Sequence, residues 1–140
     1  MSYHRAKRKG IINFFLISTL VLPVLAVFSD PYNIKSNLLF IIILCIPLFI
    51  LLWVYLDTYY IIENNYLKYK SAFLKGKIPI AEIKEIQKGK TLWNGRKPAL
   101  SAHGLIIIYS HNKRIYIAPD NNEKLLAELL DINNNIKVMD

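Results

Sequence analysis

The side chains that could carry out chemistry in this 140-residue chain do not form a catalytic set. His103 and His111 have no cysteine or paired acid at ligand spacing, so no metal site is predicted. Ser101 lacks the G-x-S-x-G frame that presents a nucleophilic serine. We interpret each histidine, His4 included, as solvated or hydrogen-bonded, and the lone Cys45 as a small apolar residue within a long apolar run. The sequence therefore predicts no catalytic residue, metal or cofactor.

Recognition is the chemistry that segment 89–104 favours, because this segment mixes basic and aromatic side chains without a clear period. A connection of about sixteen residues is longer than the usual 4–6, and such loops are often functional. Tryptophan and arginine are over-represented in binding hot spots. Two alternatives remain open. Trp93 can instead be a packing anchor, and Arg96 and Lys97 can face acidic lipid. The candidate partner-binding residues are Trp93, Asn94, Arg96, Lys97 and Ser101.

Two uncharged apolar runs, Ile11–Phe28 and Leu38–Leu56, precede the rest of the chain. As helices, at about 1.5 Å per residue, they reach about 27–28 Å, close to the hydrocarbon thickness of a bilayer. The first run is longer than the core of a signal peptide, so we expect it to be retained. Neither run has a glycine-type small-xxx-small motif, which leaves self-association unsupported. The sequence predicts a two-helix transmembrane hairpin within residues 11–56.

Positive charge indicates the orientation of this hairpin. Residues 1–10 form a basic leader, whereas the segment between the runs carries only Asp30 and Lys35. By the positive-inside rule, the N-terminus and residues 57–140 are cytoplasmic in a two-pass protein of the cell membrane. Aromatic residues near the end of the second run agree with an interface on that side. The predicted membrane-interface residues are Arg5, Lys7, Arg8, Lys9, Trp53, Tyr55, Tyr59 and Tyr60.

The net charge of +8 does not indicate nucleic acid as a partner. Residues 57–140 contain 13 Lys and Arg against 9 Asp and Glu, and these are scattered along the segment. A nucleic-acid binder normally clusters its cations on one element. We therefore expect the lipid bilayer and a protein as partners.

Residues 57–140 are enough for one small domain and begin as strands. Asp57–Glu63 and Tyr66–Leu74 flank Asn64-Asn65, a strong hairpin signal. Lys75-Gly76-Lys77 is predicted as the next turn, before a short strand at Lys77–Ile80. The isoleucines that follow fit a helical turn leading into a strand, although the pattern alone does not separate helix from strand there.

The last third of the chain predicts a second hairpin and a helix. Leu105–Tyr109 and Arg114–Ala118 are the two strands. Asp120 can cap the helix with Glu123 reaching back, and an apolar stripe of leucines follows until the helix ends at Asn133–Asn135. The predicted class is α+β and mainly β, with an antiparallel barrel or sandwich capped by a C-terminal helix.

Four stretches of this domain resemble a bacterial pleckstrin-homology (PH)-like domain family found behind short membrane anchors. The resemblance covers nearly all of residues 57–140 and implies a bent, seven-stranded antiparallel sheet whose end is closed by the helix. Lipid-binding eukaryotic relatives carry basic residues in the loop between the first two strands. Here that loop is Glu63-Asn64-Asn65, so phosphoinositide binding is not expected. The stretches are Asp57-Thr58-Tyr59-Tyr60-x-Ile62, Lys77-Ile78-Pro79-Ile80-x-Glu82-Ile83, Pro98-Ala99-Leu100-Ser101 and Ile115-Tyr116-Ile117-Ala118-Pro119.

The sequence thus predicts a leader at 1–10, two transmembrane helices within 11–56 and a PH-like domain at 57–140. The expected function is that of a non-enzymatic interaction module, anchored in the membrane, which binds a protein partner at the membrane surface. The resemblance alone supplies an alternative, because one anchored member of the family is a self-immunity protein against a bacteriocin. That alternative is antimicrobial immunity or envelope-stress protection.

Overall fold

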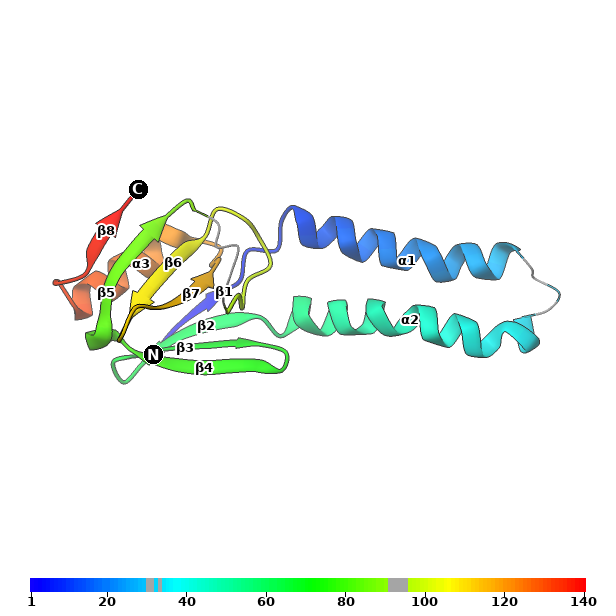
Figure 1. The fold of residues 1–140 in the computed structure, drawn as a ribbon, viewed down its shortest axis with the longest axis horizontal. Helices are drawn as coiled ribbons and strands as arrows, with labels where there is room; N and C mark the ends of the chain where they lie inside the picture. The colour runs from blue at the N-terminus through cyan, green and yellow to red at the C-terminus, as the bar shows by residue number, and fades with distance from the viewer. Residues whose placement is uncertain (30–31, 33, 91–95) are drawn as a thin grey trace.

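The computed structural model describes residues 1–29, 32, 34–90 and 96–140. Two long helices, α1 (Ile11–Ser29) and α2 (Ile34–Leu56), lie side by side and extend from one end of a β-rich domain (Figure 1). Each is long and apolar enough to cross a membrane, and the two candidate spans are only 11% and 0% buried within the protein. A helix that is apolar on all sides requires lipid or protein around it. The two predicted helices are confirmed, and the second begins at Ile34, ahead of the predicted start.

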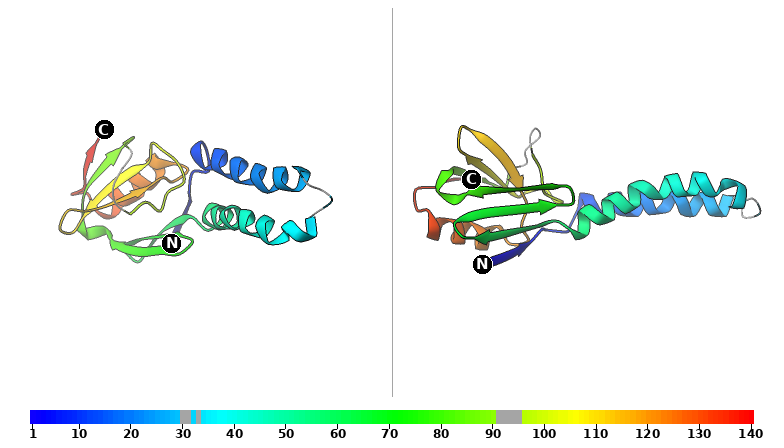
Figure 2. Two further views of the ribbon diagram at one scale, coloured as in Figure 1. Left: turned by 45° about the vertical axis from the view of Figure 1, so that its right-hand side comes forward. Right: turned by 90° about the horizontal axis from the view of Figure 1, so that it is seen from below.

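The domain contains two four-stranded sheets and a helix, seen from two further sides in Figure 2. The strand orders are β1-β2-β3-β4 and β7-β6-β5-β8, with antiparallel neighbours except for β8, which runs parallel to β5. The first sheet comprises β1 (Ser2–Arg5), β2 (Tyr59–Glu63), β3 (Tyr66–Ser71) and β4 (Leu74–Pro79). After the 3₁₀ helix η2 (Ile80–Glu82) come β5 (Ile83–Lys88), β6 (Leu105–Tyr109), β7 (Lys113–Ile117), α3 (Asn122–Ile132) and β8 (Lys137–Met139). The predicted β-rich domain with a C-terminal helix is confirmed.

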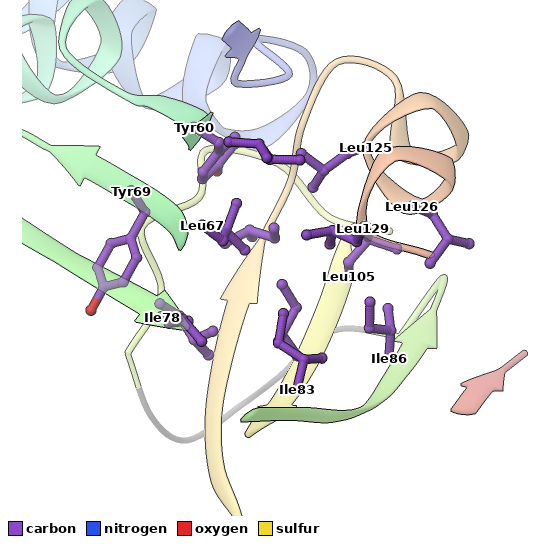
Figure 3. Packing of buried hydrophobic residues seen from close by; sticks show 14 of the residues in the cluster. Tyr60, Leu67, Tyr69, Ile78, Ile83, Ile86, Leu105, Leu125, Leu126 and Leu129 are labelled. Atoms are coloured by element: carbon purple, nitrogen blue, oxygen red, sulfur yellow. The ribbon is translucent and has the colours of Figure 1, made fainter. Parts of the chain in front are cut away.

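The hydrophobic core lies between the two sheets and α3 (Figure 3). Alternate residues of β2 and β3 point into it, which produces the buried–exposed alternation along these strands. Leu125, Leu126 and Leu129 of α3 are buried, as the leucine stripe predicts. Burying one such side chain completely contributes about 1.5–3 kcal/mol. The core is therefore the main source of stability that holds the outer faces in place.

The N-terminal residues, predicted as a basic leader, form the edge strand β1 of the first sheet. Ser2 lies opposite Ile62, and the antiparallel pairing runs to Arg5 opposite Tyr59. Beyond β1, the Lys7 amide donates to the Ala118 carbonyl at 2.8 Å. The α1–α2 hairpin is therefore inserted between two neighbouring strands of one sheet. The sequence analysis did not predict β1, because its inward side chain is polar.

That inward side chain is His4, which is only 5% exposed. Its Nε2 lies 3.0 Å from the Glu128 carboxylate on α3 and 3.2 Å from the Ser2 hydroxyl. Burial raises the pKa of Glu128, but the hydrogen bonds with Ser2 and His4 outweigh it, so the pKa lies below its usual value. The interpretation of His4 as hydrogen-bonded is thus correct, and its partner ties β1 to α3.

The turn after β3 lies earlier than the sequence pattern predicts. The residues between β3 and β4 are Ala72 and Phe73, and Ala72 has a φ of +50°. Lys75-Gly76-Lys77 is therefore strand, and the predicted short strand at Lys77–Ile80 is the end of the longer β4. Gly76 lies opposite Tyr69, and a Cβ at Gly76 would overlap the tyrosine ring. The glycine here makes room for an aromatic ring rather than for a turn.

The start of α3 also differs from the prediction. Asn121, one residue after the predicted Asp120, is the N-cap, and its side-chain oxygen accepts a hydrogen bond from the Lys124 amide at 2.9 Å. Glu123 therefore does not form the predicted capping box, and its carboxylate lies 3.5 Å from Lys88 Nζ. The helix ends at Ile132 with Asn133 as its C-cap, in agreement with the predicted end, and the side-chain amide Nδ2 of Asn133 donates to the Ile80 carbonyl at 2.9 Å.

We predict that His4→Ala loosens β1 from the domain. The substitution removes a buried hydrogen-bonding partner from Glu128, a loss that typically costs about 1–3 kcal/mol. For a domain of this size, about 1 kcal/mol corresponds to a shift of about 4–8 °C in the thermal midpoint. The midpoint of the detergent-solubilised full chain, followed by circular dichroism, should fall accordingly. The exposed His111→Ala serves as control, and equal midpoints for both variants would contradict the role of His4.

Candidate interaction surface

Four lysines gather on the outer face of the first sheet. They alternate with buried residues along β3 and β4 and so point away from the core. The register places Lys68 opposite Lys77 and Lys70 opposite Lys75. Like charges directly opposite each other destabilise a sheet, so folding does not account for this arrangement. We call these four residues the lysine face.

Aromatic rings border the lysine face. The rings of Tyr3 and Tyr59 lie 5.5 Å apart, centroid to centroid. Lys77 Nζ lies 5.1 Å from the centroid of the Tyr66 ring, within the range of a cation–π interaction. The four lysines, Tyr59, Ile61 and Tyr69 line an open groove of about 340 Å³. Aromatic residues are enriched in protein interfaces, so the tyrosines beside the open groove make this face a candidate recognition surface.

Only half of the lysine face is paired with acids. Lys68 Nζ lies 2.5 Å from the Glu63 carboxylate and Lys70 Nζ lies 2.9 Å from that of Asp57. The hydrogen bond from Lys68 lowers the pKa of Glu63, and the bond to Asp57 raises the pKa of Lys70. Both pairs are solvent-accessible, so water and salt screen them and they contribute little to stability. Among the described residues, no acidic side chain forms an ion pair with Lys75 or Lys77.

The predicted partner-binding loop is only partly described, and Trp93 and Asn94 lie outside the described residues. Arg96 hydrogen-bonds to the hydroxyl of Tyr69, which raises the pKa of the guanidinium. The Arg96 carbonyl accepts a hydrogen bond from the Tyr116 amide at 3.0 Å. Tyr69 is buried in the core, and strand alternation points its ring away from Lys68 and Lys70, so Arg96 lies on the inner side of the first sheet and not on the lysine face.

Two other residues of the predicted loop lie elsewhere. Lys97 and Ser101 line a separate shallow groove together with Ile11, the first residue of α1. The Ser101 hydroxyl donates to the Ala102 carbonyl at 3.3 Å, and the Ser101 carbonyl accepts from the Tyr116 hydroxyl at 2.8 Å. The structure thus does not bring Lys97 and Ser101 to the groove of the lysine face.

Tyr60 is not at an interface, contrary to the sequence-based prediction. Its side chain is fully buried, and its hydroxyl donates to the Pro98 carbonyl at 2.5 Å and accepts from the Ala118 amide at 3.1 Å. Burial raises the pKa of this hydroxyl. Strand alternation explains the difference, because it points Tyr59 outward and Tyr60 into the core. Tyr60 therefore joins the first sheet to Pro98, in the segment before β6, and to Ala118, directly after β7.

The other predicted interface residues lie around the junction of helices and domain. The Arg8 guanidinium lies 5.0 Å from the centroid of the Tyr55 ring, and its Nη2 donates to the Leu56 carbonyl at 3.1 Å. Trp53 is about half exposed near the end of α2. Arg5 and Lys9 are exposed, Lys7 and Arg8 partly so. Arg8 therefore connects the chain before α1 to the last turn of α2.

The remaining histidines have ordinary surroundings. His103 is exposed with a φ of +58°, and the Nδ1 of the exposed His111 lies 3.3 Å from the Ser110 hydroxyl. Within the part of the chain that the structure describes, no three His, Cys, Asp or Glu side chains come together as a metal site requires.

Comparison with known proteins gives a family and one weak relative. The chain is 27% identical over 88 residues to an uncharacterized protein, YyaB, of Bacillus subtilis (strain 168). The matched region covers 62% of this chain and 60% of YyaB, so the chain spans less than two thirds of this relative. No solved structure matches. These comparisons give no support to bacteriocin immunity.

The family match coincides with the β domain described above. The profile of the bacterial PH domain covers residues 58–133, from Thr58 just before β2 to Asn133 at the end of α3. It leaves out β1 and β8, the strands that each extend one sheet at its edge. More than half of the chain matches this family profile, and the architecture agrees with the predicted one. The chain therefore belongs to the bacterial PH domain family.

Proposed function

We propose that this chain is a non-enzymatic, membrane-anchored PH-like interaction module that binds an acidic protein partner at the cytoplasmic surface of the cell membrane. The observation that carries the proposal is the lysine face, a basic and aromatic surface on the first sheet. Membership of the PH family supports an interaction module, because PH domains commonly bind proteins or lipids.

The membrane part of the proposal rests on the helices and on charge. If α1 and α2 cross the bilayer, β1 and the rest of the domain lie on the same side, since β1 pairs with β2. This side carries Lys7, Arg8 and Lys9 next to the helices, whereas segment 29–37 has one charge of each sign. The positive-inside rule therefore supports a cytoplasmic domain and N-terminus.

The chemistry of the lysine face supports an acidic protein as the partner. Lys75 and Lys77 are exposed and form no ion pair with an acidic side chain among the described residues. Tyrosine supplies much of the binding energy in protein interfaces, and Tyr59 lines the groove beside these lysines. Trp93, Asn94, Lys97 and Ser101 remain predicted contributors from the loop that follows β5.

We predict that Lys75→Glu with Lys77→Glu abolishes partner binding. A photo-crosslinking residue at Ile61, in the floor of the groove, should yield a discrete adduct in native membranes that this double variant loses. Reversing charges at an interface lowers affinity and the association rate, so a loss of at least about tenfold in adduct is expected. Both lysines are exposed, so the fold should remain intact.

The matched control is Lys113→Glu with Lys137→Glu, which makes the same charge change on exposed residues of the second sheet. This control should keep the adduct. Equal amounts of adduct in both double variants would refute the lysine face as the binding surface. So would the absence of an adduct from Ile61 in the chain that keeps all four lysines.

We also predict the orientation of the chain. With Cys45 replaced by alanine, a single cysteine at the exposed Ala127 on α3 should resist an impermeant thiol reagent in intact cells and react after lysis. A cysteine at Tyr32, which is 96% exposed between the two helices, should react in intact cells. The reverse pattern would place the domain outside the cell.

A further inference from the structure

Phe73 is an exposed aromatic residue at the tip of the β3–β4 hairpin. It exposes 76% of its surface, nearly as much as Phe28 on the apolar helix α1 at 78%. Its neighbours are not exposed in the same way, because Ala72 is buried and Leu74 packs against the core. The turn therefore projects one apolar side chain out of an otherwise anchored hairpin.

Hydrogen bonds fix this tip next to the end of α2. The Thr58 hydroxyl donates to the Val54 carbonyl, in the last turn of α2, at 2.5 Å and lies 2.8 Å from the Ser71 hydroxyl. Ser71 pairs with Leu74, so Phe73 lies beyond Ser71 on the side of the helices. All views show the hairpin tip beside the point where α2 joins the domain (Figures 1 and 2).

The opposite end of the same sheet points away from the helices. The β2–β3 turn at Asn64-Asn65 lies against η2, where the Ile80 amide donates to the Asn65 carbonyl at 2.9 Å. The Glu63-Asn64-Asn65 loop, the counterpart of the basic loop in lipid-binding eukaryotic relatives, therefore lies at the end of the sheet remote from α2 (Figure 1). Any lipid contact of this sheet is therefore expected at the end next to α2, where the β3–β4 tip and the Arg5 end of β1 lie.

Charge next to Phe73 suits anionic lipid. Lys70 and Lys75 form the lysine pair closest to the tip and lie opposite each other across the hairpin. A lysine near an anionic leaflet adds about fivefold to membrane affinity, and phenylalanine of basic interfacial segments is buried at the boundary of headgroups and acyl chains. The pattern of one exposed aromatic residue flanked by cations matches the chemistry of such an interface.

We propose that the β3–β4 tip docks into the anionic leaflet from which α2 emerges, with Phe73 in the headgroup region and Lys75 on a lipid phosphate, since Lys70 is paired with Asp57. This inference rests on the proposed membrane anchoring. It assigns Lys75 to lipid and leaves Lys77 directed toward the partner, so the loss of the adduct in Lys75→Glu with Lys77→Glu is assigned to Lys77. The docked tip holds the first sheet upright on the membrane, with the groove facing sideways.

The test uses the full chain in vesicles, with Trp53 and Trp93 replaced by phenylalanine and a single tryptophan introduced. Phe73→Trp should be quenched by lipids brominated near the headgroup, at least about threefold more than Tyr66→Trp at the other end of the sheet. Phe49→Trp in α2 reports the anchor through lipids brominated deep in the acyl chain.

The composition of the vesicles tests the charge. Quenching of Phe73→Trp should be stronger with phosphatidylglycerol than with phosphatidylcholine alone. Lys75→Glu should reduce the ratio of docked to undocked tip at least about fivefold, whereas the remote Lys113→Glu should not. Equal quenching in both vesicle types, or an unchanged ratio in Lys75→Glu, would overturn the role of anionic lipid.

The failure of the inference can be distinguished from failure of the anchor. Deep quenching at Phe49→Trp without shallow quenching at Phe73→Trp would overturn the docking while the anchor stands; a tip that instead binds protein would give this result. If neither tryptophan is quenched, both the anchor and the docking are wrong.

Discussion

The pairing of β1 with β2 is the constraint on which the rest of the structure depends. It places the residues before α1 beside those after α2, as neighbouring strands of one sheet. Neighbouring strands lie about 4.8 Å apart and packed helices about 8–10 Å apart, so only a short connection is needed to pass from one to the other. That connection is secured by the Lys7 amide on Ala118 and by Arg8 on the last carbonyl of α2. The helix hairpin is therefore part of the sheet rather than an appendage joined by a linker.

This attachment determines which surfaces can act together. The end of α2 passes into β2 within two residues, and Thr58 binds both the helix and the β3–β4 hairpin. The first sheet thus has one end close to the helices and one end remote from them. The lysine face runs between these ends and is open along its side. With the proposed anchoring, a partner on this face would stand beside the membrane, while the core and α3 behind the sheet keep the face in position.

The sequence predicts those elements whose pattern is local. Asn64-Asn65 between two alternating runs predicts the β2–β3 hairpin, and the leucines of α3 predict its buried stripe. β1 could not be predicted, because its strand exists through pairing with residues on the far side of both helices and through the contact of His4 with Glu128. Gly76 between two lysines has the composition of a turn, whereas the space it leaves is filled by the Tyr69 ring. Because a turn was predicted at Lys75-Gly76-Lys77, the lysine face was not predicted. Lys75 and Lys77 lie opposite Lys70 and Lys68 only because β4 begins at Leu74. Tyr60 was assigned to lipid although alternation after Tyr59 points it inward.

The most direct test of this account is the proximity of β1 and β2 in the membrane-bound chain. In a chain with Cys45 replaced by alanine, cysteines at Tyr3 and Ile61 face each other on the outer side of the sheet. Such opposite positions have Cα atoms about 4.5–5.5 Å apart, within the range of about 4.4–6.8 Å that a disulfide spans. Mild oxidation of native membranes should link these two positions in most chains, and mass spectrometry should detect the disulfide-linked peptides. A pair at Tyr3 and Arg114, on separate sheets, should remain unlinked. Linkage at Tyr3 and Ile61 no greater than in that control pair would contradict the account, because β1 would not belong to the sheet.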